Sequence, residues 1–155
     1  MKPAPFQYVR PESTDEAVEA LEEHDDPTLL AGGQSLIATM NGRLATPETM
    51  VDISHVEDLD YIREENGEVA IGALTTQSTA ESSETVIDNC PLVAEALSNV
   101  GHETIRNKGT IGGNLAHADP TSELPSVALL KHATFVLRGP DGKRTVDAED
   151  FFLGH

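Results

Sequence analysis

Two short segments of the chain combine paired glycines with residues that could hold a ligand. They span residues 31–35, which read AGGQS, and residues 110–114, which read TIGGN. Adjacent glycines let backbone amides approach an oxyanion without an intervening Cβ, and a helix that starts after such a turn adds unpaired N–H groups and a positive dipole end. Together the two segments predict a pyrophosphate site. The alternative is two ordinary tight turns, because glycine commonly marks turns.

The charge distribution makes the second segment the less repulsive one for an anion. Residues 1–75 carry 16 acidic and 4 basic side chains, whereas residues 76–155 carry 11 and 6. Arg106 and Lys108 flank the second glycine pair. Because the whole chain has a net charge of -17, we expect any anion to be held by local contacts.

Other catalytic and binding motifs are absent from the sequence. Neither G-x-G-x-x-G nor G-x-x-x-x-G-K-[ST] occurs, which argues against a Rossmann or P-loop site. Ser35 does not lie in a G-x-S-x-G motif, so we expect it to cap a helix or to hold a ligand. The six histidines lack metal-binding spacing. His117 and Asp119 are the one pair of interest, with hydrogen bonding inside a loop as the alternative.

The composition excludes several classes of function. With 27 acidic and 10 basic residues, the chain would repel nucleic acid and anionic membrane surfaces. The single cysteine, Cys90, cannot form an internal disulfide, a thiolate zinc site or an iron–sulfur cluster. Without an apolar leader or a run of 18 apolar residues, the sequence predicts a cytoplasmic protein. Its acidity indicates a halophilic cytoplasm, where salt screens self-repulsion, or else a basic docking partner.

The first 55 residues alternate between strand and helix patterns. Strands are predicted at residues 6–9, 28–31 and 49–53, with a helix after the capping box at residues 13–16 and another after Ser35. This alternation predicts a small parallel sheet in a subdomain spanning residues 1–55.

A second subdomain, residues 56–155, is predicted to be mainly antiparallel. Hairpins are expected at residues 61–72 and 134–146, and helices at 76–82, 91–100 and 125–130, with Gly101 ending the second of these. Residues 110–115 are predicted as a glycine-interrupted extended segment, followed by a polar loop up to Glu123. The fold class is therefore α+β, with an apolar segment at residues 151–155.

Four segments taken jointly resemble one family. They are residues 30–36 (LAGGQSL), 51–53 (VDI), 71–75 (IGALT) and 106–120 (RNKGTIGGNLAHADP). In this order they are similar to the FAD-binding (medium) subunit of the molybdenum hydroxylases, of the carbon monoxide dehydrogenase and xanthine dehydrogenase type. The run at 106–114 is long enough to be specific, whereas a single glycine pair is not.

The resemblance implies a two-subdomain FAD-binding fold of the vanillyl-alcohol-oxidase (PCMH) type, with FAD held between the subdomains. It implies that amides of the first glycine segment bind the pyrophosphate and that the glycines of the second segment also contact phosphate. It further implies that Ile111 lies near the flavin ring and that Glu123 accepts a hydrogen bond from a hydroxyl of FAD. The implied cofactor-binding residues are Leu29, Leu30, Ala31, Gly32, Gly33, Gln34, Ser35 and Leu36 in a first loop, Thr110, Ile111, Gly112, Gly113 and Asn114 in a second loop, and Glu123.

The resemblance also implies a role in electron transfer without substrate chemistry on this chain. Substrate would be oxidised at a molybdopterin centre in a large partner subunit, and electrons would pass through two [2Fe-2S] clusters in a small one to FAD here. The single cysteine agrees with clusters carried elsewhere. The alternatives are a fragment that binds no flavin and serves as an assembly module, and a stand-alone flavin oxidoreductase, for which we find no acid–base residues.

The end of the sequence departs from the family pattern. Family members continue beyond the Phe-Phe-x-Gly segment at residues 151–154, so the resemblance implies that the C-terminal part of the FAD domain is missing. The apolar residues 151–153 are then expected to be adhesive or to pair with another chain.

Overall fold

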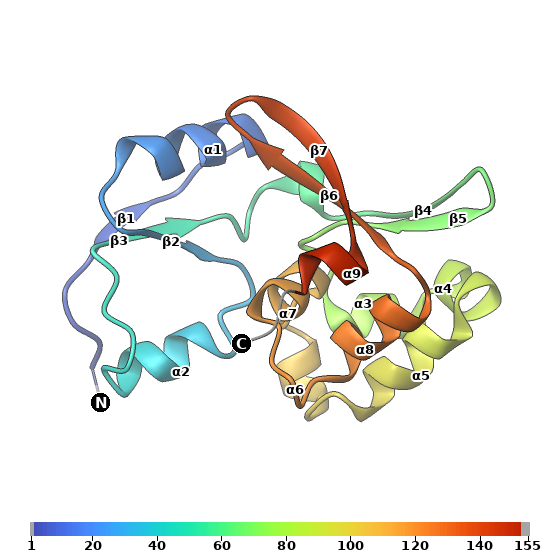
Figure 1. Ribbon diagram of the computed structural model, residues 1–155. Coiled ribbons are helices and arrows are strands. Elements are labelled where there is room, and N and C mark those ends of the chain that lie inside the picture. Colours follow the sequence, from blue (N-terminus) through green and yellow to red (C-terminus); the bar gives the residue numbers. More distant parts are fainter. Residues whose placement is uncertain (1, 153–155) are drawn as a thin grey trace.

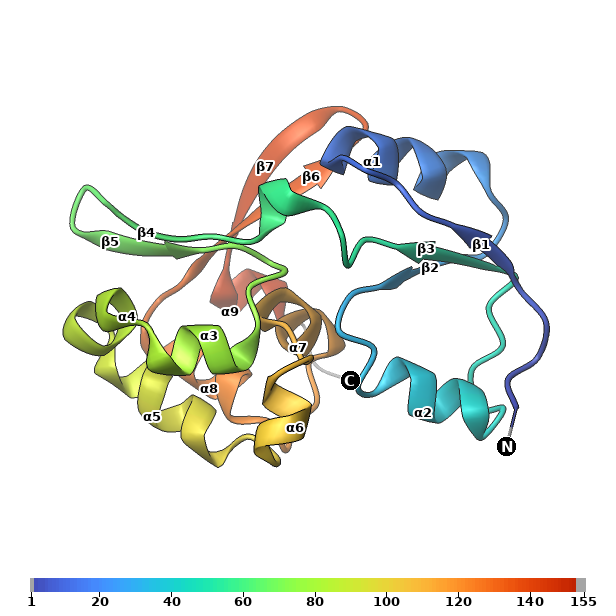
Figure 2. The same ribbon diagram turned by 180° about the vertical axis from the view of Figure 1, so that it is seen from behind.

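Two halves with different architecture lie side by side in the molecule (Figures 1 and 2), in a computed structural model that describes residues 2–152. The first half is a three-stranded parallel sheet with one helix on each face. The second half is a group of helices with two antiparallel hairpins. This mixture of a parallel sheet and antiparallel hairpins confirms the predicted α+β class.

The parallel sheet is built as the sequence predicts. Its strand order is β1-β3-β2, so β3 is the central strand, and all four of its residues are buried. At the start of α1 the Ser13 Oγ accepts a hydrogen bond from the Glu16 amide at 3.2 Å, while the Glu16 carboxylate accepts from the Glu12 amide at 2.8 Å. The elements are β1 (Gln7–Val9), α1 (Thr14–Glu23), β2 (Pro27–Leu30), α2 (Leu36–Asn41) and β3 (Thr49–Asp52).

The second half contains more short helices than the sequence predicts. The first hairpin turns at Asn66 and Gly67, both with positive φ, which suits the right-handed twist of paired strands. The elements are a 3-10 turn η1 (Glu57–Leu59), β4 (Ile62–Glu65), β5 (Glu68–Ile71), α3 (Gln77–Ser82), α4 (Glu84–Asn89), α5 (Pro91–Asn99), α6 (Glu103–Arg106), α7 (Ile111–His117), α8 (Glu123–Leu130), β6 (Thr134–Gly139), β7 (Gly142–Asp147) and α9 (Ala148–Phe151).

The prediction of an extended segment at residues 110–115 is wrong. Only Thr110 is extended, in a single bridge with Thr76, and α7 starts at the next residue. The Thr110 Oγ1 accepts from the Gly113 amide at 3.1 Å, so the threonine caps a helix that contains both glycines. Helix α8 likewise begins at Glu123, two residues earlier than predicted.

The core consists of two hydrophobic clusters, of which the first joins the two halves and the second lies within the second half. One joins α1 and β3 and includes Val51 at its centre, together with Val56 and Leu74 from beyond residue 55. The other joins Leu97 of α5 to Ile111 of α7 and to residues of α3 and α8. Because the first cluster takes side chains from both sides of residue 55, the boundary between residues 1–55 and 56–155 stays a prediction.

The β6–β7 hairpin extends from the second half to α1 of the first (Figure 1). Its Arg138 donates to Asp15 of α1 from Nη2 at 2.9 Å and from Nε at 3.2 Å. At its base, the rings of Phe135 and Phe151 lie 4.5 Å apart, and Phe152 packs edge-on against both. These two terminal phenylalanines thus have a partner in β6, while residues 153–155 lie outside the described residues.

Within residues 2–152, no helix has the length and apolarity needed to cross a bilayer. The same residues contain no group of three or more His, Cys, Asp or Glu side chains placed to bind a metal ion.

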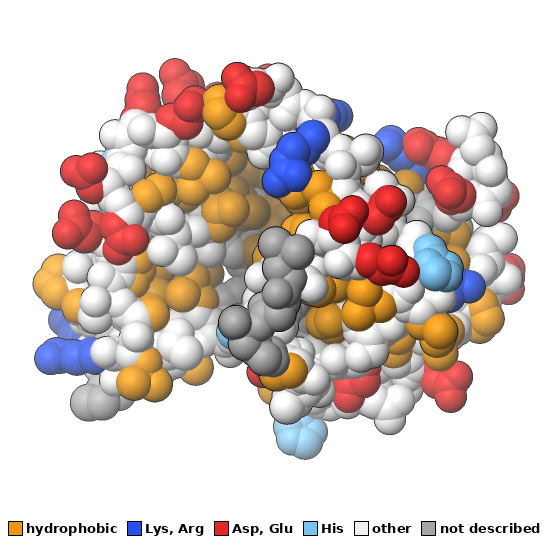
Figure 3. Space-filling model, viewed as in Figure 1, with side chains coloured by type: hydrophobic (Ala, Val, Ile, Leu, Met, Phe, Trp, Pro, Cys, Tyr) orange, Lys and Arg blue, Asp and Glu red, His pale blue; other side chains and the backbone are white. Residues whose placement is uncertain are grey.

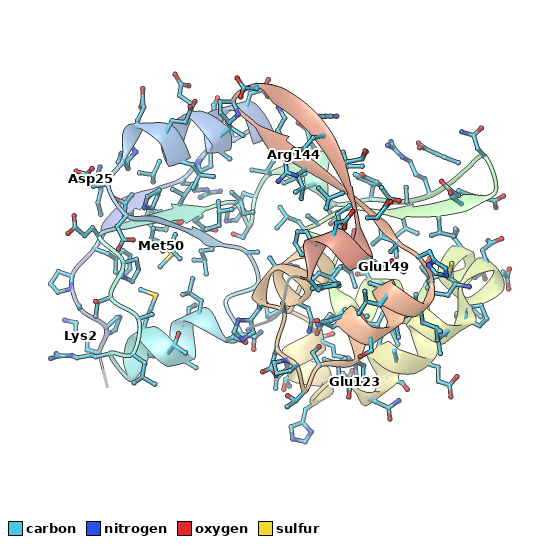
Figure 4. All side chains as sticks on the ribbon, in the orientation of Figure 1. Lys2, Asp25, Met50, Glu123, Arg144 and Glu149 are labelled. Atoms are coloured by element: carbon cyan, nitrogen blue, oxygen red, sulfur yellow. The ribbon has the colours of Figure 1, made fainter. Side chains whose placement is uncertain are left out.

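Acidic side chains gather over α1, at the upper left of Figure 3. On the opposite side of the sheet, Met50 faces α2 (Figure 4).

A hydrogen bond between Tyr8 and Asp52 links the acid stability of the sheet to one hydroxyl. The Tyr8 hydroxyl donates to Asp52 Oδ2 at 2.5 Å, and the Ser54 amide donates to Oδ1 at 2.9 Å. Burial alone would raise the pKa of Asp52, but these hydrogen bonds and the nearby His55 outweigh it and hold the pKa below its usual value. Mainly because of the same bond, the pKa of Tyr8 is raised.

We expect Tyr8→Phe to weaken the dependence of stability on acid pH. A carboxylate with a lowered pKa adds stability that is complete above the unfolded value, about 3.9, and is lost as the pH falls toward the folded value. Without the Tyr8 hydroxyl this loss should shrink, as measured by urea unfolding across the acid range. Tyr61→Phe is the control, because no hydrogen bond of the Tyr61 hydroxyl occurs among the described residues. Equal acid profiles for Tyr8→Phe and the unchanged chain would contradict this account.

Candidate functional site

The first glycine loop follows β2 and presents a row of unpaired amides. Within the described residues, the backbone N–H groups of Gly32, Gly33, Gln34 and Ser35 donate no hydrogen bond. Gly33 has a φ of +70°, a conformation that favours glycine, and a Cβ there would lie 2.8 Å from Ile37. The loop therefore has the conformation and the free donors that an anion needs.

Ser35 lies at the start of a helix, as the sequence predicts, but its side chain does not cap that helix. Ser35 precedes α2 as its N-cap residue, but its backbone is helical, at φ -97° and ψ -48°, and its side chain makes no capping hydrogen bond. The Ser35 hydroxyl is therefore available to a ligand.

The two glycine loops pack directly against each other. A Cβ on Gly32 would lie 2.1 Å from the carbonyl oxygen of Lys108 and 2.9 Å from Gly109. A Cβ on Gly113 would lie 3.7 Å from the Cβ of Ala31. Only glycine fits at position 32, because a backbone carbonyl cannot turn aside as a flexible side chain can.

In the second loop, the backbone amides of residues 111–114 all donate hydrogen bonds within the protein. The amide of Ile111 donates to Thr75 at 2.9 Å, and that of Gly112 donates to Ala73 at 2.8 Å. The Gly113 amide is taken by Thr110, and the Asn114 amide by the Thr110 carbonyl. The amides of residues 111–114 are thus used within the protein, so the expected phosphate contact of these glycines has no free donor there.

Glu123 is tied to the second loop through its neighbour. It is half-buried at the start of α8, in the second half of the molecule (Figure 4). The Ser122 hydroxyl donates to Asn114 Oδ1 at 2.8 Å, which connects α8 to α7. Direct contact of Glu123 with a cofactor hydroxyl stays a prediction.

A pocket of about 370 Å³ lies where the loops meet. The surface is hollowed between the two halves in Figure 3. The pocket is lined by Ala31, Gly32, Ser54, His55, Leu74, Thr76, Asn107, Lys108 and Thr110. The first loop supplies two of these residues, the turn that follows β3 supplies two, and the stretch before α7 supplies three.

Three of the predicted site residues, Ala31, Gly32 and Thr110, line this pocket, and Gly113 lies beside Ala31. Leu30 packs near Gly33, Leu36 starts α2, and Leu29, 44% exposed, lies on the edge strand β2. The sequence did not single out the pocket residues Ser54 and His55. The signal that could have found them was their position after the strand 49–53, at the carboxyl end of a parallel sheet.

Two other predicted features have structural roles. Arg106 donates from Nε to Glu81 at 2.7 Å and from Nη1 to the carbonyls of Val100 and Gly101, so it is not available to an anion. Asp119 accepts from the amide and hydroxyl of Thr121, as the alternative of loop hydrogen bonding predicts.

Residues 4–155 match the family described as the FAD binding domain in molybdopterin dehydrogenase. The chain belongs to this family. The first loop, the second loop and the pocket all fall within the matched region. FAD is the cofactor of this family, and the resemblance seen in the sequence is confirmed.

Relatives of known function match the domain over its full length. The carbon monoxide dehydrogenase medium chain of Hydrogenophaga pseudoflava is 44% identical, over 99% of this chain and 54% of its own length. The glyceraldehyde dehydrogenase medium chain of Sulfolobus acidocaldarius is 41% identical, over 99% of this chain and 55% of its own length. The FAD-binding domain therefore spans about half the length of these relatives.

Solved structures confirm the fold. Carbon monoxide dehydrogenase from Hydrogenophaga pseudoflava superposes with a TM-score of 0.96 at 45% identity, covering 99% of this chain and 54% of that one. Quinoline 2-oxidoreductase from Pseudomonas putida 86 gives a TM-score of 0.97 at 36% identity, covering 100% of this chain and 54% of that one. The predicted FAD-binding fold is thus confirmed.

The residues of the first loop fit the pyrophosphate of FAD. Four consecutive free amides, a left-handed glycine and a glycine that permits close backbone approach are what a diphosphate needs. When bound, FAD supplies the electron chemistry, since flavins carry out both one- and two-electron transfer. The chain itself supplies binding and orientation.

Proposed function

We propose that this FAD-binding domain is the electron-transfer part of a molybdenum hydroxylase medium subunit. Two electrons removed from a substrate at a molybdopterin centre in a large subunit pass singly through [2Fe-2S] clusters of a small subunit, reach FAD here, and leave to an external acceptor. The partners are these two subunits, and the substrate is oxidised elsewhere than on this chain.

The observation that carries the proposal is the row of unpaired amides at residues 32–35, beside a pocket formed by both glycine loops. The relatives support it, because those named above are medium chains of dehydrogenases. A flavin-free assembly module would not need the left-handed backbone at Gly33 or the close packing at Gly32.

Reconstitution with the partner subunits tests the proposal. The FAD-loaded chain is mixed with its iron–sulfur subunit, whose clusters have been chemically reduced, and the visible absorption of the flavin is followed. We expect the flavin to bleach at the rate at which the clusters reoxidise, and its colour to return when an acceptor is added. A bound flavin that keeps its oxidised spectrum beside reduced clusters would contradict the proposal.

We further propose that the protein works in a salt-rich cytoplasm. Its net charge of -17 is self-repulsive in dilute buffer, and salt screens that repulsion over about 10 Å at 0.1 M. The melting temperature should therefore rise as KCl is added, by several degrees between dilute and molar salt. A melting temperature that falls with added KCl would contradict this assignment.

A further inference from the structure

The pocket beside the first loop differs in charge from the rest of the chain. The chain has 27 acidic residues, yet none of the described residues that line this pocket is Asp or Glu. Two of them, His55 and Lys108, can carry positive charge. Because no carboxylate lines this pocket, an anion bound there would meet less electrostatic repulsion than elsewhere on this acidic chain.

Lys108 is the one fixed positive charge among these lining residues. Arg106, two positions earlier, is held by Glu81 and by two backbone carbonyls. Lys108 is exposed, and its side chain makes no ion pair or hydrogen bond with the described residues. Its ammonium group is therefore free to meet a ligand.

The backbone of Lys108 lies directly against the first loop. Its carbonyl oxygen would be 2.1 Å from a Cβ on Gly32, and its amide donates to Ile105 at 3.1 Å. The lysine thus starts from a fixed point beside the free amides of residues 32–35. A flexible four-carbon stem with three donors can reach an anion held on those amides.

We infer that the side chain of Lys108 binds the diphosphate of FAD directly. The inference rests on the proposed function and adds a specific side chain to it. The amides of residues 32–35 give the diphosphate its place, and the ammonium of Lys108 neutralises part of its charge within a chain that otherwise repels it.

The affinity of Lys108 variants for FAD and for riboflavin tests this inference. Riboflavin has the same ring but no phosphate, so it does not report on the contact. Lys108→Gln should lower FAD affinity about ten-fold at low salt, less at molar salt, and leave riboflavin affinity unchanged. Lys108→Arg, which keeps the charge, should stay close to the unchanged chain. Circular dichroism checks that each variant is folded.

Lys131→Gln provides the control for net charge. Lys131 follows α8, outside the pocket, and the substitution removes the same charge. Equal loss of FAD affinity in Lys108→Gln and Lys131→Gln, an unchanged affinity in Lys108→Gln, or an equal loss for riboflavin would each overturn the inference. An unchanged chain that is folded and binds no FAD would instead overturn the proposed function.

Discussion

Replacing Gly32 by alanine is expected to lower the affinity for FAD by about a hundred-fold. The added Cβ would lie 2.1 Å from the carbonyl oxygen of Lys108, so the two glycine loops must separate. Moving the loop withdraws amides from the diphosphate, and two hydrogen bonds to a charged group are worth about 3 kcal/mol. Equilibrium titration with FAD, followed by flavin fluorescence, measures the change.

Gly139→Ala is the matched control for Gly32→Ala. A Cβ at Gly139 meets nothing within 4 Å, so the same chemical change is harmless there. FAD affinity of Gly139→Ala should equal that of the unchanged chain. If folded Gly32→Ala kept an affinity within about three-fold of it, a difference of only ~0.7 kcal/mol, FAD would not be bound through the packed loops.

Leu97→Ala is expected to lower the free energy of unfolding by about 2–5 kcal/mol. Leu97 is fully buried in the cluster that includes Ile111 of α7 and Leu124 of α8. Removing it leaves a cavity under the helix that contains the second glycine pair, and a packed interior relaxes only partly. Urea unfolding at constant salt, followed by circular dichroism, gives the value.

Leu44→Ala serves as the control, since Leu44 is 86% exposed. Its free energy of unfolding should change by less than about 0.5 kcal/mol. A loss of under ~1 kcal/mol for Leu97→Ala would mean that α5 and α7 do not share a close-packed core.

The local signals in the sequence predicted the first half well. The capping box at residues 13–16 placed α1, and the alternation of strand and helix patterns placed a parallel sheet. In the second half, the hairpin predicted at residues 61–72 forms and turns at Asn66 and Gly67. Each of these features is set by neighbouring residues, which is why it can be predicted from a single sequence.

The features that the sequence missed depend on contacts between distant residues. Helices α4 and α6 are only 6 and 4 residues long, too short to show a helical period. The glycines at 112 and 113 suggested extended chain, but Gly112 is helical because its amide and its missing Cβ let α7 approach Ala73. The contact between Gly32 and Lys108, which helps to form the pocket, depends on tertiary packing between residues far apart in the sequence.

Titration of the folded chain with FAD in strong salt tests the central claim most directly. The visible absorption spectrum and the flavin fluorescence are recorded before and after FAD is added. The account predicts stoichiometric binding, with the flavin retained through gel filtration, because the free amides at residues 32–35 and the packed loops already form the diphosphate site. A folded chain that retains no flavin would contradict it.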